Sequence, residues 1–119
     1  MEIQTHQIND TRIAELISAA LIIDSVEDGI NLLGDLYYQD FESIVIHEKN
    51  ITPRFFELKN GMAGEILQKF SNYRVRLAIV GDFEIYSSKS LRDFIHESNQ
   101  GKQVSFVGSV SEALAKLSR

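Results

Sequence analysis

Residues 75–82 read Val-Arg-Leu-Ala-Ile-Val-Gly-Asp, and this stretch decides the fold class. A continuous apolar run of this length is typical of a β-strand covered on both faces, as strands of parallel sheets usually are. Gly81 and Asp82 end the run, because glycine and aspartate favour turns and loops. Residues 43–47 (Ser-Ile-Val-Ile-His) and 103–107 have the same character. The three runs predict a sheet that is parallel in its centre.

Helical signals fill the segments before and after residues 43–47. Ser25 and Asp28 form a capping box, in which the serine side chain accepts from a backbone N–H three residues on, so a helix runs from there to about Gln39. The Thr-Pro pair at 52–53 predicts a second helix start, since proline at the first helical position loses no hydrogen bond. The Asn-Gly pair at 60–61 kinks or interrupts this second helix.

Two further capping boxes follow the 75–82 strand. Ser90 and Asp93 predict a helix that Gly101 ends in a left-handed conformation. Ser109 and Glu112 predict a C-terminal helix. Each of these helices follows a predicted strand, which is the alternation expected of an α/β protein.

The N-terminal part of the chain differs from the rest. Residues 2–8 and 12–17 are β-prone and are separated by Asn9-Asp10, a pair that tolerates turn conformations, so they predict a hairpin. We therefore expect one α/β domain over residues 1–119. Its mixed sheet has about five strands, parallel in the centre with the hairpin at one side, and about four helices pack on it.

The composition limits the classes of function. The chain has 119 residues and no cysteine, which excludes disulfides, thiolate zinc sites and a cysteine nucleophile, and suits a reducing cytoplasm. A net charge of −5 would repel nucleic-acid phosphates. The longest apolar run, Ala19–Ile23, is far shorter than the roughly 20 residues that cross a membrane. We expect a cytoplasmic protein that binds neither nucleic acid nor membrane.

Sequence motifs for catalysis are absent from the chain. It has no Gly-x-Ser-x-Gly nucleophile elbow, no phosphate-binding loop and no dinucleotide fingerprint. The Gly61 and Gly64 pair has no strand before it, so these glycines are expected to allow close helix packing or a kink. His6 and His96 lack partners at metal-ligand spacing and are expected on the surface. We predict no catalytic residue, no metal and no cofactor.

Polar residues at the strand ends are the first candidate site. Ligands of open α/β sheets gather at the carboxyl ends of the strands, where His47, Glu48 and Asp82 would meet if their strands are neighbours. An imidazole and two carboxylates suit a divalent metal or acid–base chemistry. The alternative is that they are solvated loop residues, which nearly every α/β domain has at these positions.

Most of the chain resembles a known family. The resemblance rests on residues 55–74 (FFELKNGMAGEILQKFSNYR), 77–83 (LAIVGDF) and 88–99 (SKSLRDFIHESN), which resemble a bacterial domain family of unknown function. The layout also resembles STAS-type domains, the anti-sigma-factor antagonist fold. STAS regulators carry a phosphorylated serine where a central strand meets the next helix. Only Thr52 offers a hydroxyl at that junction, and its simplest role is the helix cap.

The family-like block is rich in polar residues. If the helices on either side of the 75–82 strand flank it, Lys69, Asn72, Asp82 and Asn99 line one polar cleft. With Glu48 they are our candidate ligand-binding residues. The alternative is that they serve as helix surface, caps and hydrogen bonds between helices.

Two adjacent aromatic pairs are the candidate interface. In a helix, neighbouring side chains point about 100° apart, so Tyr37 and Tyr38 cannot both face one core, nor can Phe55 and Phe56. One ring of each pair is expected on the surface, at a dimer interface or partner groove, although half-exposed aromatics are also common on monomers.

Two hypotheses of function remain. The first is a non-catalytic regulatory or protein-interaction module that acts with a protein partner and as a homodimer. The second is a small-molecule-binding protein or enzyme with a polar site around Glu48, Asp82 and Lys69. A deep pocket with convergent carboxylates favours the second, and an exposed apolar patch favours the first.

Overall fold

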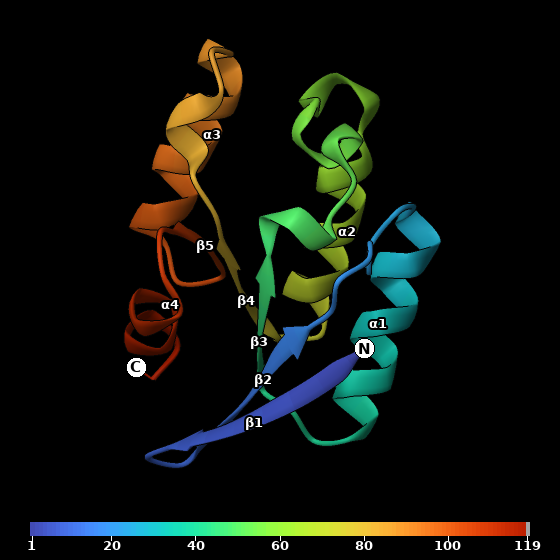
Figure 1. Ribbon diagram of the computed structural model, residues 1–119, viewed down its shortest axis with the longest axis vertical. Coiled ribbons are helices and arrows are strands. Elements are labelled where there is room, and N and C mark those ends of the chain that lie inside the picture. Colours follow the sequence, from blue (N-terminus) through green and yellow to red (C-terminus); the bar gives the residue numbers. More distant parts are fainter. Residues whose placement is uncertain (119) are drawn as a thin grey trace.

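The computed structural model describes residues 1–118. Over this range one five-stranded sheet has the strand order β1-β2-β3-β4-β5. The first two strands pair antiparallel and the others are parallel (Figure 1). The strands are β1 (Glu2–Ile8), β2 (Thr11–Ile17), β3 (Ser43–His47), β4 (Arg76–Val80) and β5 (Val104–Val107). The predicted α/β fold, with a mixed sheet and an N-terminal hairpin, is confirmed.

Four α-helices in residues 1–118 complete the layers. They are α1 (Val26–Tyr38), α2 (Met62–Asn72), α3 (Lys89–Gln100) and α4 (Val110–Leu117). In Figure 1 α1 and α2 lie on one side of the sheet and α4 lies on the other. α3 packs against β5 and contributes to the same core as α1 and α2. None of the helices in this range is long and apolar enough to cross a membrane.

Side-chain alternation divides the strands between two cores. Ile44 and Ile46 of β3 point to the larger core under α1 and α2, together with residues of α3. Val45, between them, points to the smaller core, where Ala113 and Leu117 of α4 pack. Because successive side chains of a strand point to opposite faces, an apolar run is buried on both sides. This is why three short apolar runs were enough to indicate the sheet.

The capping signals of α1 and α4 are confirmed. The Ser25 hydroxyl accepts from the N–H of Asp28 at 3.0 Å, and Ser109 accepts from the N–H of Glu112 at 3.1 Å. The Asp28 carboxylate accepts from the N–H of Asp24 at 2.9 Å, one residue before the helix cap. Both helices therefore begin where the sequence indicates.

The helix predicted to start at Thr52-Pro53 and to be interrupted at Asn60-Gly61 is confirmed at both places, but it consists of 3₁₀ turns and not of an α-helix. Residues Pro53–Phe56 and Leu58–Asn60 form short 3₁₀ turns, and α2 begins only after Gly61, whose φ is +79°. A left-handed residue cannot continue a right-handed helix, so Gly61 separates the turns from α2. Thr52 makes no capping bond with its side chain and is buried, while its N–H donates to the carbonyl of Ile23 at 2.8 Å. A phosphorylated Thr52 does not fit this position.

The predicted start of α3 is wrong by two residues, whereas its predicted end at Gly101 is confirmed, although without the left-handed conformation. The helix cap is Ser88, not Ser90, and the Ser88 hydroxyl accepts from the N–H of Leu91 at 3.3 Å. An ion pair between Lys89 and Asp93, 2.7 Å apart, lies on the first turn. Gly101 has a φ of −91°, so it ends α3 without a left-handed conformation.

Candidate functional site

The carboxyl ends of β3, β4 and β5 meet at one end of the sheet. β3 pairs with β4, and β4 with β5, so the segments that follow these strands are neighbours. A 3₁₀ turn, Phe83–Ile85, follows β4 and borders a cleft, and Tyr86, directly after the turn, lines an apolar groove. This end of the sheet is the candidate site.

Glu48 ties the end of β3 to the segment after β4. One oxygen of its carboxylate accepts from the N–H of Asp82 at 3.2 Å, and the other accepts from the hydroxyl of Tyr86. Gly81 allows this close approach, because a Cβ added to it would lie 2.6 Å from the Cβ of Glu48. The predicted meeting of Glu48 and Asp82 is confirmed, and both carboxylate oxygens of Glu48 are used within the protein.

The Tyr86 hydroxyl donates the second of the two hydrogen bonds that Glu48 accepts. Burial raises the pKa of Tyr86 well above its ordinary value, and the hydrogen bond to Glu48 and the charge of that carboxylate raise it further. Tyr86 therefore stays protonated and donates to Glu48 at neutral pH. The contact fixes the segment after β4 rather than supplying a proton.

His47 does not join Glu48 and Asp82. It lies on the opposite face of the sheet, where its Nε2 is 3.5 Å from the carboxylate of Glu15. His6 contacts the other oxygen of that carboxylate at 2.9 Å, so it is not the unpartnered surface residue that was expected. Within residues 1–118 no three His, Cys, Asp or Glu side chains are grouped so as to hold a metal ion.

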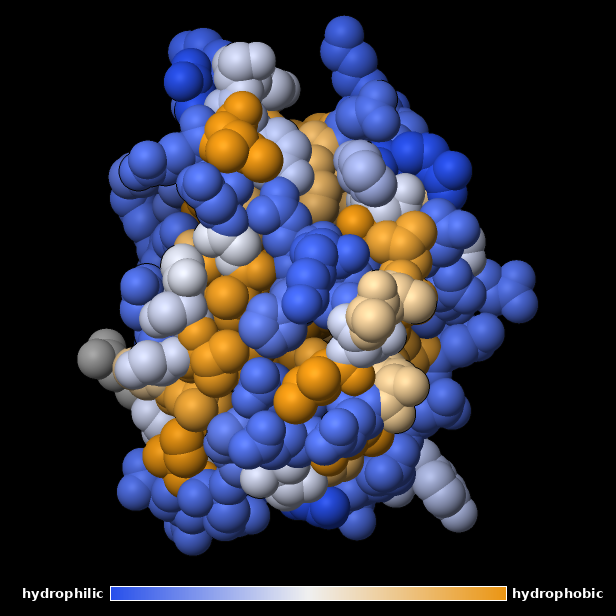
Figure 2. Space-filling view, viewed as in Figure 1, coloured by the Kyte–Doolittle hydropathy of each residue, from blue (hydrophilic) through white to orange (hydrophobic). Residues whose placement is uncertain are grey.

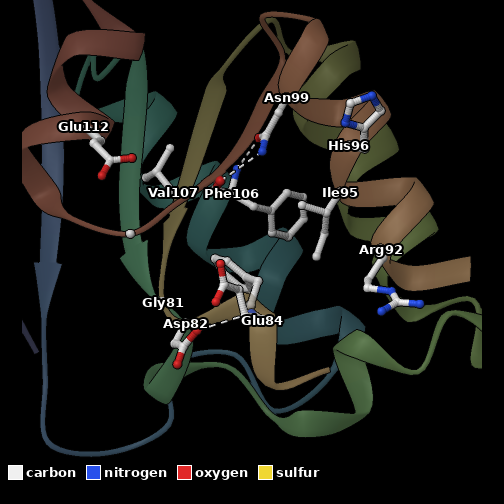
Figure 3. A pocket seen from close by; sticks show the side chains of 12 residues that line it. Gly81, Asp82, Glu84, Arg92, Ile95, His96, Asn99, Phe106, Val107 and Glu112 are labelled. Carbon is white, nitrogen blue, oxygen red and sulfur yellow. Dashed lines mark hydrogen bonds between the residues drawn. The ribbon is translucent and has the colours of Figure 1, made fainter. Parts of the chain in front are cut away.

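The cleft lies at the ends of β4 and β5 and has a volume of about 480 Å³. Figure 3 shows Arg92, Ile95 and His96 along α3 on one side and Glu112 of α4 on the other. Asp82 lies at the lower edge in this view, and one of its carboxylate oxygens accepts from the N–H of Glu84 at 3.2 Å. The charged side chains of the cleft are exposed and surround an apolar floor.

Asn99 lines the same cleft, but its amide group has partners within the protein. The side-chain oxygen accepts from the N–H of Phe106 at 2.7 Å, and the side-chain nitrogen donates to the carbonyl of Phe106 at 3.1 Å (Figure 3). The amide therefore pairs with the outer edge of β5 as a neighbouring strand would. Lys116 also donates to the backbone carbonyl of Asn99, at 2.9 Å.

Lys69 and Asn72 are not part of this cleft. Lys69 lines a separate hollow between α1 and α2, and Asn72 is exposed and accepts from Gln68 at 2.9 Å. The reason is the direction of the chain: α2 ends where β4 begins, at the amino end of the parallel strands. Asp82 and Asn99 are thus the two of the four predicted cleft residues that the structure brings together.

The apolar groove lies between the segment before α2 and the start of α3 and has a volume of about 520 Å³. Figure 2 shows it as the hollow at the top of the view, with hydrophobic residues in its depth. The apolar side chains that line the groove are those of Pro53, Phe56, Leu58, Tyr86 and Leu91. Hydroxyl and charged groups at its rim come from Ser87, Ser88, Ser90, Glu57 and Lys59.

A second hollow, of about 480 Å³, adjoins the groove. Both are lined by Pro53, Phe56 and Tyr86; we call these three residues the ridge, and Phe56 lies at its base, only 5% exposed. The second hollow adds Leu21 and Ile85, whose exposed fractions of 47% and 69% are high for large apolar side chains. The two hollows make one apolar surface with a central ridge.

Contacts between aromatic rings hold this ridge together and join it to the sheet. The Phe56 and Tyr86 rings stack with centroids 5.2 Å apart, and Phe83 packs edge-on against Phe106 of β5 at 5.3 Å. Ring pairs of this kind are favourable beyond their buried area. The ridge is therefore anchored to the sheet through its aromatic side chains and through the Glu48 tie.

The prediction that one ring of each aromatic pair is exposed is wrong for Phe55 and Phe56. Both are buried, with exposed fractions of 2% and 5%, because they lie in a 3₁₀ turn between the sheet and the groove and not on an α-helix. Tyr37 and Tyr38 are both exposed, at 51% and 88%, and Tyr73 packs edge-on against Tyr37 at 5.2 Å. The tyrosines remain candidates for an interface.

Sequence reasoning missed Leu21, Ile85 and Tyr86. The available signal was an Ile-Tyr pair at 85–86 between Gly81 and Ser88, in a segment that otherwise reads as a polar loop. Apolar residues in such a loop are either buried or part of a binding surface. Ile85 is exposed and lines the second hollow, whereas Tyr86 is partly buried and belongs to the ridge.

Comparison with known proteins adds the family. Residues 8–117 match the family described as "Domain of unknown function (DUF4180)". No curated protein and no solved structure matches the chain, so the STAS-like layout stays a prediction. The match spans nearly all of the 119 residues. The chain therefore belongs to the DUF4180 family, a family of unknown function.

Proposed function

We propose that this protein is a non-catalytic protein-interaction module that binds a partner through the apolar groove and the adjoining second hollow. The observation that carries this proposal is the continuous apolar surface on both sides of the Pro53, Phe56 and Tyr86 ridge. Exposed apolar patches of this kind mark interaction sites when polar residues surround them. Here Glu57, Lys59 and three serines form that polar rim.

The ridge is held in place before any partner binds. Glu48 accepts from Tyr86 and from the backbone of Asp82, and the Phe56 ring stacks on Tyr86. A surface that is already ordered loses little conformational entropy on binding, so more of the contact energy contributes to affinity. This suits a recognition surface.

The shape of the surface indicates the kind of partner. Two hollows separated by a ridge fit a segment with two large apolar side chains, one for each hollow. The partly buried Leu58 offers apolar contact in the groove, and Leu21 and Ile85 offer it in the second hollow. Hydrogen bonds from the rim serines and the two rim charges would orient the segment. We propose a partner protein that presents such a segment.

The enzyme hypothesis has less support from the geometry. It requires Glu48, Asp82 and Lys69 at one place, but Lys69 lies in a separate hollow between α1 and α2. The carboxylate oxygens of Glu48 already accept from Tyr86 and from the backbone of Asp82. Of the three residues that the hypothesis names, Asp82 alone lines the cleft, so the predicted polar site is not assembled there.

Selection of peptides from a random displayed library tests the proposal. We expect the selected peptides to share two large apolar side chains at a fixed spacing. Two substitutions at exposed positions should weaken their binding at least tenfold: Ser87→Arg, which places a charge at the groove, and Ile85→Asp, which places one in the second hollow. Tyr38→Asp is the control, because Tyr38 is 88% exposed and lies outside this surface.

The outcome that contradicts the proposal is equally clear. If selected peptides bind the Ser87→Arg and Ile85→Asp proteins as tightly as the unchanged protein, the apolar surface is not the binding site. If only Tyr38→Asp weakens binding, the site lies at the exposed tyrosines of α1.

A further inference from the structure

The two outer edges of the sheet differ in how they are protected. The outer edge of β5 is covered by α3, whose Asn99 amide bonds both the N–H and the carbonyl of Phe106. Edge strands need such protection, because unpaired N–H and carbonyl groups can pair with a strand of another chain. At the β5 edge the protein supplies its own substitute for a neighbouring strand.

The β1 edge has no bulge, proline or lysine to protect it, and Glu2 is its one acidic residue. All seven residues of β1 pair with β2 in an unbroken register, so no bulge twists this edge away. The strand reads Glu-Ile-Gln-Thr-His-Gln-Ile, without proline or lysine. No strand among residues 1–118 pairs with its outer side. A long, regular and nearly uncharged edge strand is well suited to pair with another strand.

The hairpin determines which backbone groups of β1 point outward. A two-residue loop makes the flanking residues, Ile8 and Thr11, a hydrogen-bonded pair, and such pairs alternate along antiparallel strands. The N–H and carbonyl groups of the alternate residues Ile3, Thr5 and Gln7 therefore point away from β2. These three residues offer the free backbone groups of the edge.

We propose that a second copy of this chain pairs with this edge, antiparallel and about a two-fold axis at Thr5. In that register Thr5 faces Thr5 of the second copy, and Ile3 faces its Gln7. All three outward-pointing residues then form hydrogen-bonded pairs, and the two sheets join into one. This proposal is independent of the apolar groove, which lies at the carboxyl ends of the strands and not at the β1 edge.

The sequence of β1 favours this register over its neighbours. A shift by one residue would place outward-pointing groups opposite groups that already bond to β2, and a shift by two would pair fewer of them. In the Thr5-centred register Gln4 faces His6 and Glu2 faces Ile8, so no two like charges are opposed. An isologous contact of this kind closes after two copies, so it yields a dimer and not a fibre.

Light scattering coupled to size exclusion tests the dimer. We expect the unchanged protein to elute as a dimer and Thr5→Pro to elute as a monomer. Proline removes the outward N–H at the centre of the contact, and edge strands tolerate proline where the N–H faces away from the sheet. Tyr38→Asp should remain a dimer, because the exposed tyrosines are not part of this contact. Circular dichroism checks that Thr5→Pro keeps its fold.

Cysteine cross-linking tests the register even if Thr5→Pro fails to fold. The chain has no cysteine, so each introduced thiol can form a disulfide only with its copy. Thr5→Cys should cross-link rapidly under mild oxidation, because the two residues face each other. Gln7→Cys should not, because Gln7 of the second copy is four residues away along the strand, about 13 Å, whereas a disulfide needs Cα atoms within about 7 Å.

Three results would overturn the inference. The first is an unchanged protein that is monomeric at every concentration. The second is dissociation by Tyr38→Asp but not by Thr5→Pro, which would place the contact at α1. The third is equal cross-linking of Thr5→Cys and Gln7→Cys, which would show collision between copies without a register.

Discussion

Glu48 illustrates, at the scale of single residues, how a polar group at a strand end can serve the fold. The carboxylate follows a parallel strand, where active-site residues of α/β proteins often lie. Its two oxygens instead accept from Asp82 and Tyr86, on the segment after the next strand. The adjacency of Glu48 and Asp82 follows from strand order and could be predicted. The role of Tyr86 could not, because nothing in its local sequence indicates that its ring turns back to Glu48.

Gly81→Ala tests this tie. A Cβ at this position would lie 2.6 Å from the Cβ of Glu48, so the Glu48 side chain must move and its two hydrogen bonds weaken. We expect the free energy of unfolding to fall by about 1–3 kcal/mol, measured by urea denaturation. Gly108→Ala is the matched control at the end of the next strand, because its Cβ would meet Glu112 at an ordinary 3.6 Å. Equal losses in both variants would contradict the account.

The titration of Tyr86 is a second prediction at this scale. Burial and the Glu48 contact raise the pKa of the folded protein's Tyr86 above its ordinary value of 10.0. Above pH 10 the unfolded chain loses this proton while the folded protein keeps it, so unfolding releases a proton and stability falls as pH rises. The stabilisation from this contact is thus fully present below pH 10 and is lost above it.

Tyr86→Phe measures that dependence. The variant should be less stable than the unchanged protein at about pH 8, and the difference should shrink toward about pH 11. The difference in tyrosinate absorbance between the two folded proteins should show Tyr86 ionising above pH 10.0. If this difference spectrum titrates at or below pH 10, the Tyr86 hydroxyl does not donate to Glu48 in solution.

Among the elements, α1 and α2 show where helix packing depends on one residue. Gly29 of α1 lies against Ile66 of α2, so that an added Cβ would lie within 3.0 Å of three side-chain atoms of Ile66. Gly61 and Gly64 were expected to allow close helix packing or a kink; neither has an atom near an added Cβ, and Gly61 instead interrupts the chain before α2. The glycine of a close contact could not be identified from sequence, because the contact depends on a residue far along the chain.

Gly29→Ala should therefore destabilise the protein although alanine is the better helix former. We expect a loss of about 1–2 kcal/mol, since overpacking costs more than the gain in helix propensity. Gly34→Ala, in the same helix but with open space around the added Cβ, should stabilise by about 0.5–1 kcal/mol. Urea denaturation with unchanged m-values checks both. A stabilising Gly29→Ala would mean that the two helices are farther apart.

Helix ends differ in how well local sequence indicates them. Ser25 and Ser109 cap their helices as expected, because each cap bond joins residues three apart in the chain. Thr52 and Pro53 also begin a helix, but it is a short 3₁₀ helix, and the Thr52 side chain makes no capping bond. Local sequence thus indicated where this helix begins but not which type of helix forms.

At the scale of the whole molecule, the sheet could be predicted and the binding surface could not. Apolar runs and alternating helices indicate strand type and connectivity from local pattern alone. Lys69 and Asn72 were placed wrongly although the predicted order of elements puts the end of α2 at the amino end of β4, away from the carboxyl ends of the strands. The apolar surface combines residues from Leu21 to Leu91, brought together only by the complete fold.

The central claim is that this apolar surface binds a protein partner, and chemical-shift mapping tests it most directly. Isotope-labelled protein is titrated with a peptide taken from the library selection, and backbone amide shifts are followed by NMR. We predict that the largest shifts fall in residues 53–58 and 85–91, on both sides of the ridge. Largest shifts in residues 92–99 and 108–112 of the cleft, or at Tyr37 and Tyr38, would contradict the claim.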